Sequence, residues 1–126
     1  MKKTYSEIKA AAKAKQITFQ TVMAVRAAME ETVLEMLSTT HAVRGAAIAF
    51  TIRDRFQVDF TDVNVRAIIR RLRLKGYVII GGPKGYYIPK AKSQIDNYIK
   101  SRKAEIKGEL KCLDSMRQSP VYERLI

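Results

Sequence analysis

The side chains best suited to recognition chemistry lie in residues 61–75, TDVNVRAIIRRLRLK, where arginine recurs and Asp62 is the single acid. Arg66 and Arg70 are four residues apart, so a helix places them on one face. Arginine can donate two hydrogen bonds to guanine O6 and N7, and asparagine can pair in the same way with adenine N6 and N7. The pattern therefore predicts a helix that recognises base edges in duplex DNA.

The position of each polar residue in this helix suggests its role. Recognition helices usually insert their N-terminal end into the major groove, so Asn64, Arg66 and Arg70 are predicted to contact bases. The basic residues nearer the C-terminal end are predicted to contact phosphates or to flank the groove. The alternative is an exposed face kept soluble by arginine, and the near absence of compensating acids argues against it.

The residues after this helix predict a β-hairpin. Gly76 stands where a helix C-cap glycine belongs, and two short apolar runs, 77–80 and 86–88, are joined by Gly81 to Gly85. The loop would carry Lys84 to a phosphate or into the minor groove. It lacks the G-x-x-x-x-G-K-[ST] pattern of a nucleotide-binding loop and joins two strands. The predicted DNA-contacting residues are Asn64, Arg66, Ala67, Arg70, Arg71, Arg73, Lys75, Lys84, Tyr86 and Lys90.

Apolar spacing upstream predicts the helices that would support this segment. Period-3.6 patterns indicate helices over 19–37 and 45–56, and 57–60 is expected to be a turn. Thr61 or Asp62 is expected to cap the helix 61–75. Thr4 and Glu7 form a capping-box pattern that predicts an N-terminal helix over residues 5–15.

The C-terminal segment predicts a long charged helix over 93–117. Ser93 and Asp96 resemble a capping box, and Pro120 is expected to end the ordered chain. The apolar residues do not keep a heptad spacing, so a long coiled coil is not supported. The helix could pack on the preceding domain or pair with a second copy. Its apolar residues are Ile95, Ile99, Ile106, Leu110 and Leu113.

Charge and composition favour a nucleic-acid partner. The 126 residues carry a net charge of +12, and residues 61–92 hold eight Lys/Arg against one acid. No apolar stretch is long enough to span a membrane, and the N-terminus lacks a signal sequence. Cys112 is the single cysteine and His41 the single histidine, so we expect no internal disulfide, no catalytic constellation and no metal site. We also expect no cofactor and no small-molecule ligand. A reducing, cytoplasmic location is the expected setting.

Residues 43–90 resemble winged helix-turn-helix proteins common in bacteriophages and other mobile elements of bacteria. The matching motifs are Val65-Arg66, Ile69, Leu72-Arg73, Gly76-Tyr77, Ile79 and Gly85-Tyr86-Tyr87-Ile88. The chain departs from that pattern at Arg44, where a capping Ser or Thr is usual. The resemblance implies DNA binding more firmly than it implies any particular task.

The expected fold is mainly α with a small β-hairpin. We predict an N-terminal helical extension over 1–21, a winged helix-turn-helix over 22–92, and a C-terminal helix and tail over 93–126. The expected function is sequence-specific binding of double-stranded DNA, as a transcriptional regulator of a phage or mobile element and not as an enzyme. The alternative is a protein–protein adaptor, for instance at a replication origin. RNA binding is less favoured because few aromatic residues are free to stack on unpaired bases.

Overall fold

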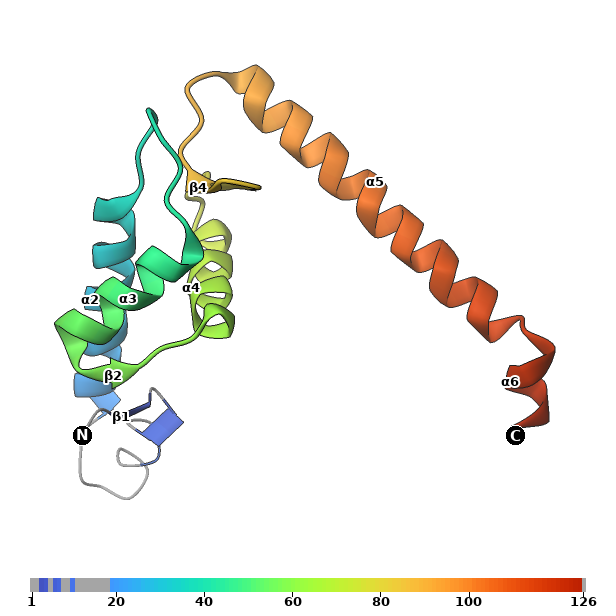
Figure 1. The fold of residues 1–126 in the computed structure, drawn as a ribbon, viewed down its shortest axis with the longest axis horizontal. Coiled ribbons are helices and arrows are strands. Elements are labelled where there is room, and N and C mark those ends of the chain that lie inside the picture. Colours follow the sequence, from blue (N-terminus) through green and yellow to red (C-terminus); the bar gives the residue numbers. More distant parts are fainter. Residues whose placement is uncertain (1–2, 5, 8–9, 11–18, 126) are drawn as a thin grey trace. The chain divides into compact units, whose positions relative to one another are not determined.

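The computed structural model describes residues 3–4, 6–7, 10 and 19–125, and these are mainly helical with a small antiparallel sheet (Figure 1). They belong to two compact units, residues 1–89 and 90–126. Most of the predicted helix 5–15 lies outside the described residues. The capping box that predicted it is formed, because the Glu7 N–H donates to Thr4 Oγ1 at 3.0 Å and the Thr4 N–H donates to Glu7 Oε2 at 3.1 Å.

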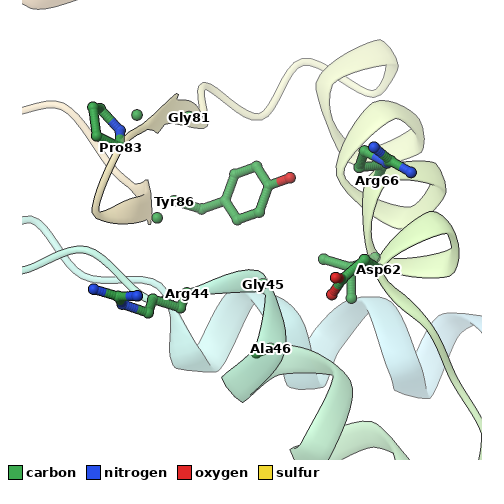
Figure 2. Close-up of a pocket in the computed structure, with 11 residues that line it drawn as sticks. Arg44, Gly45, Ala46, Asp62, Arg66, Gly81, Pro83 and Tyr86 are labelled. Carbon is green, nitrogen blue, oxygen red and sulfur yellow. The ribbon is translucent and has the colours of Figure 1, made fainter.

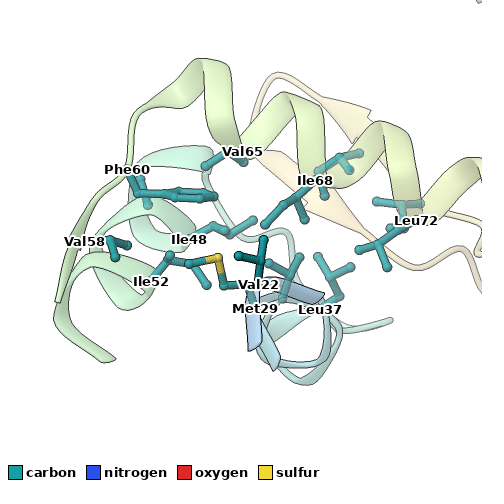
Figure 3. Packing of buried hydrophobic residues seen from close by; sticks show 14 residues of the cluster. Val22, Met29, Leu37, Ile48, Ile52, Val58, Phe60, Val65, Ile68 and Leu72 are labelled. Carbon is teal, nitrogen blue, oxygen red and sulfur yellow. The ribbon is translucent and has the colours of Figure 1, made fainter. Parts of the chain in front are cut away.

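Three helices supply the core of the first unit, and their positions confirm the predictions from apolar spacing. They are α2 (Phe19–Met36), α3 (Gly45–Phe56) and α4 (Asp62–Leu74). Each buries one face against the others (Figure 3). The buried apolar residues are Val22, Met29, Val33, Leu37, Ile48, Ala49, Ile52, Val58, Phe60, Val65, Ile68, Ile69, Leu72, Ile79 and Ile80. Each of the larger side chains in this set contributes roughly 1.5–3 kcal/mol when fully buried, so this cluster is the main source of the unit's stability.

The link between α3 and α4 differs from the turn predicted over 57–60. Val58–Asp59 forms strand β2, which pairs in parallel with β1 (Lys3–Thr4). Gln57 ends α3 in the left-handed conformation, with φ 54°. Val58 and Phe60 point into the core, so the link is anchored by burial on one side and by strand pairing on the other.

Both ends of α4 are capped by short-range hydrogen bonds. Thr61 is the N-cap as predicted, and its backbone N–H and hydroxyl both donate to Asn64 Oδ1 at 2.9 Å. At the other end the Gly76 N–H donates to the Arg73 carbonyl at 3.0 Å, and the Tyr77 N–H donates to the Leu72 carbonyl at 3.1 Å. With Gly76 at φ 101°, this is the Schellman arrangement expected of a C-cap glycine.

The strands of the hairpin have different extents from those predicted. Its strands are β3 (Ile80–Gly82) and β4 (Gly85–Tyr87), so the turn is only Pro83-Lys84 and not the five residues 81–85. The predicted strand 77–80 was wrong in extent, because pairing begins at Ile80 and Tyr77 is exposed.

A further bridge ties the hairpin to the segment before α3. The Val43 N–H donates to the Tyr86 carbonyl and the Tyr86 N–H donates to the Val43 carbonyl, both at 2.8 Å. The connection between α2 and α3 therefore contains an extended residue, Val43, that pairs along the outer edge of β4. This bridge fixes the hairpin beside the start of α3.

The second unit consists of α5 (Lys92–Arg117) and α6 (Pro120–Arg124). The cap of α5 is not the predicted Ser93–Asp96 pair, because Gln94 Oε1 accepts from the backbone N–H groups of Lys90 and Ala91 at 2.6 and 3.3 Å. Pro120 begins a short helix instead of ending order, with Ser119 as its N-cap. No residue of α5 is buried.

Replacing Gly85 with alanine should destabilise the first unit strongly. Gly85 has φ 122°, and a Cβ there would lie 2.4 Å from the Val43 carbonyl oxygen. We expect Gly85→Ala to lower the free energy of unfolding by about 2 kcal/mol or more, measured by urea denaturation. Gly82→Ala is the matched control, since its Cβ would meet nothing closer than the Tyr87 ring at 3.9 Å. Equal losses in the two variants would contradict the proposed role of the Val43 bridge.

Candidate nucleic-acid interface

The outward face of α4 carries the central residues of the predicted interface. The inward stripe of α4 is fully buried in the core, and Arg66, Ala67 and Arg70 are exposed on the opposite side. Val63 and Leu74 continue the same outer strip at spacings of four residues and are 62% and 77% exposed. Exposed alanine and valine side chains can contact thymine methyl groups beside arginines that bind guanine. Sequence reasoning missed Val63, although its i, i+4 spacing to Ala67 was a signal.

Two of the residues predicted to contact phosphates, Arg71 and Lys75, form ion pairs with a buried acid on α2. The Glu30 side chain is only 6% exposed. Lys75 Nζ donates to both of its carboxylate oxygens, at 2.8 and 3.0 Å. Arg71 Nε lies 3.6 Å from Glu30 Oε1, which is an ion pair without a hydrogen bond. The structure therefore places Arg71 and Lys75 on the α2 side of α4, apart from the outer strip.

Arg73 lies on the opposite flank of α4, beside the hairpin. Its Nε donates to the Ile79 carbonyl at 2.9 Å. A Cβ placed on Gly81 would lie 3.6 Å from a terminal nitrogen of the same guanidinium. Arg73 thus braces the chain between α4 and β3.

Asn64 is also committed to a structural hydrogen bond. Its Oδ1 accepts both bonds from Thr61 that begin α4. Bidentate pairing with adenine needs this oxygen as well as the amide nitrogen, so the cap competes with base contact.

A pocket of about 520 Å³ opens where the starts of α3 and α4 meet the hairpin (Figure 2). Arg44 and Arg66 contribute its cations, and Asp62 contributes an acid. Tyr86 extends from β4 toward α4 and lines the pocket. Gly45 lies beside its ring, since a Cβ there would stand 3.8 Å from Tyr86 Cε2, an ordinary van der Waals distance. Tyr86 is therefore a wall of the pocket as well as a strand residue.

The chemistry of this pocket suits a phosphate group. Arg44 is the N-cap of α3, and its side chain makes no capping hydrogen bond. The first N–H groups of a helix have no partner within the helix, and the helix dipole favours an anion at this end. Arg44 and Arg66 also line the pocket, on opposite sides of Tyr86, and their two positive charges exceed the one negative charge of Asp62. Arg44 thus puts a cation at the N-cap of α3, where a neutral Ser or Thr would be usual. Sequence reasoning did not identify Arg44 as part of the candidate site.

The remaining predicted residues fall in different places. Lys84 is exposed in the two-residue turn of the hairpin, and Tyr86 lines the pocket. Lys90 belongs to the second unit, so it is not assigned to this interface. The structure thus brings Arg66, Ala67 and Arg70 together on one helix face, with Tyr86 and Lys84 on the neighbouring hairpin.

Comparison with known proteins gave no matching family model, no matching curated protein and no matching solved structure. Within the part of the chain that the structure describes, no group of three His, Cys, Asp or Glu residues is placed to hold a metal ion. No helix among those residues combines the length and apolar character needed to cross a bilayer.

Replacing Glu30 with glutamine should destabilise the first unit. The change removes the carboxylate that balances two cations, one of which has its Nε buried without a hydrogen bond. We expect the free energy of unfolding to fall by about 2 kcal/mol. This is less than the largest losses seen when a buried ion pair is broken, because Lys75 remains half exposed to water. Urea denaturation at one fixed protein concentration measures it. Glu31→Gln, one residue along on the exposed side of α2, should change little, and a similar loss there would refute the assignment.

Proposed function

We propose that this protein binds double-stranded DNA in a sequence-specific manner, with α4 in the major groove. The observation that carries the proposal is the outer face of α4, where Arg66, Ala67 and Arg70 are exposed side by side. Two arginines around a small side chain provide donors for guanine and space for close approach to the base edges. A net charge of +12 supplies the general attraction to phosphates.

The arrangement of elements supports a winged helix-turn-helix as the binding module. In this assignment α3 and α4 are the helix pair, α4 is the recognition helix, and the β3–β4 hairpin is the wing. The Val43 bridge supplies a short third strand at the edge of β4. The same assignment agrees with the resemblance of residues 43–90 to winged-helix proteins of phages and mobile elements, from which we infer a role in regulating transcription.

The side-chain placements divide the interface into base contacts and phosphate contacts. Arg66 and Arg70 are the proposed base contacts, because both are exposed and neither forms an ion pair among the described residues. The pocket at the start of α3 is the proposed seat of one backbone phosphate, and Lys84 of the wing would meet another. Arg71 and Lys75 are not among the proposed phosphate contacts, because both form ion pairs with Glu30.

Substitution at the base-contacting positions should reduce both affinity and selectivity. We expect Arg66→Ala and Arg70→Ala each to weaken binding to a selected site by roughly 10- to 100-fold, with a smaller effect on random duplexes. The selected site comes from enrichment of a random duplex pool, and affinities come from gel shifts or fluorescence anisotropy. Lys111→Ala is the control, since it removes one charge from exposed α5. An equal effect from the control, or no retardation of any duplex at low salt, would contradict the proposal.

Lys84 should behave differently from the arginines of α4. As a phosphate contact without base specificity, its loss in Lys84→Ala should weaken all duplexes about equally. The slope of log affinity against log salt should fall by about 1, because one fewer counterion is released on binding. A salt series with selected and random duplexes measures both quantities. A loss of affinity for the selected duplex alone would instead indicate that Lys84 contacts a base.

A second candidate function is a protein–protein adaptor built on the same module. The observation that favours it is the exposure of Val63 and Leu74 on the outer strip of α4, since apolar side chains also suit a protein partner. Charge reversal at Arg66 and Arg70 separates the two functions. It should abolish DNA binding, whereas contacts with a protein through Val63 and Leu74 would survive.

A further inference from the structure

Helix α5 has an apolar face that nothing in its own unit covers. Its 26 residues correspond to a length of about 39 Å at 1.5 Å per residue. Ile99, Ile106, Leu110 and Leu113 are between 45% and 59% exposed, and no residue of the helix is buried. Helices in proteins gain most of their stability from packing one apolar face, so this one is incomplete as an isolated element.

The apolar residues of α5 follow a regular spacing that is not a heptad. Ile95 and Ile106 are 11 residues apart, and so are Ile99 and Leu110. The third member of each repeat is Arg102 in the first and Leu113 in the second. An 11-residue repeat corresponds to 3.67 residues per turn, close to the 3.6 of a straight α-helix. The spacing that drifts against a heptad is therefore a straight stripe along one side of α5.

The charges beside the middle of this stripe, at residues 103–109, are segregated by sign, whereas Asp96 and Asp114 nearer its ends fall on the lysine flank. At 100° per residue, Glu105 and Glu109 fall on one flank of the stripe, and Lys103 and Lys107 fall on the other. When two copies of such a helix lie parallel with their stripes together, the acidic flank of each faces the lysine flank of the other. Charges flanking an apolar seam in this way set partner choice and orientation in helix pairs.

We propose that α5 is a dimerisation helix that pairs in parallel with α5 of a second copy of this chain. The stripe supplies the buried seam, and the flanking charges make the surface complementary to itself. Arg102 is the polar interruption of the seam, and its guanidinium pairs with Glu105 on its own helix. This pairing is independent of DNA binding, so either proposal can fail without the other.

The mass of the full-length protein tests the dimer directly. Sedimentation equilibrium over a concentration series should show a species of twice the 14.3 kDa chain mass. Ile106→Lys combined with Leu110→Lys places charges in the seam and should weaken the dimer by at least roughly 100-fold. Ala104→Lys is the matched control on the opposite side of the helix and should leave the dimer intact. A monomer at every concentration, or equal weakening in the control, would overturn the proposal.

A variant that dimerises more tightly provides a further test, because misfolding would not raise the affinity of the dimer. Arg102→Leu completes the third position of the first 11-residue repeat with an apolar side chain, so it should tighten the dimer by roughly 10-fold. Circular dichroism at 222 nm checks that the helix content of each variant is retained. A weaker dimer with retained helix content would show that Arg102 does not face the seam.

Charge exchange tests whether the partner is a second copy. Glu105→Lys with Glu109→Lys makes both flanks basic, and Lys103→Glu with Lys107→Glu makes both flanks acidic. Each variant alone should dimerise less than the unchanged protein, and their equimolar mixture should form a heterodimer that high salt weakens. Two variants that remain monomeric when mixed would refute the self-complementary surface.

Discussion

The buried carboxylate of Glu30 is the constraint on which the arrangement of the first unit depends. It lies on α2 beside the apolar stripe, and its side chain is only 6% exposed, so its charge must be balanced within the protein. Lys75 and Arg71 provide that balance from α4. This contact joins α2 to α4 in the rotation that the buried apolar stripe of α4 requires, with Arg71 and Lys75 on the side of α2.

This rotation divides the basic residues of α4 into groups with different roles. Arg71 and Lys75 turn toward α2, and Arg73 turns toward the hairpin and donates to the Ile79 carbonyl. The outward strip keeps Arg66 and Arg70. The high local charge of residues 61–92 is thus partly structural, and only a subset of it remains for the proposed DNA contact. Arg44, outside that segment, adds a cation at the start of α3.

Periodicity in the sequence was enough to predict the helices of the first unit and their buried faces, because burial of one face is what the pattern records. The pairing of β1 with β2 was not predictable, since strands of two residues carry no periodic signal and the partners lie far apart in sequence. The extents of the hairpin strands were predicted wrongly because Tyr77 resembles a strand residue, whereas the Val43 bridge and Gly85 fix the pairing. Glu30 was missed because a single sequence does not show which acid of a helix will be buried.

The two proposals together explain how so small an exposed face could provide a specific DNA contact. Two arginines and one pocket per copy make few contacts, and each bidentate pair contributes only about 1–3 kcal/mol of discrimination. Joining two copies makes the second binding event intramolecular, so affinity for a site with two half-sites rises steeply without any new contact per copy. Because the described chain places α5 in a separate unit, the spacing of those half-sites would depend on the segment near Pro89 and Lys90 that joins the two units. A parallel pair of α5 helices has two-fold symmetry, which corresponds to a palindromic DNA site.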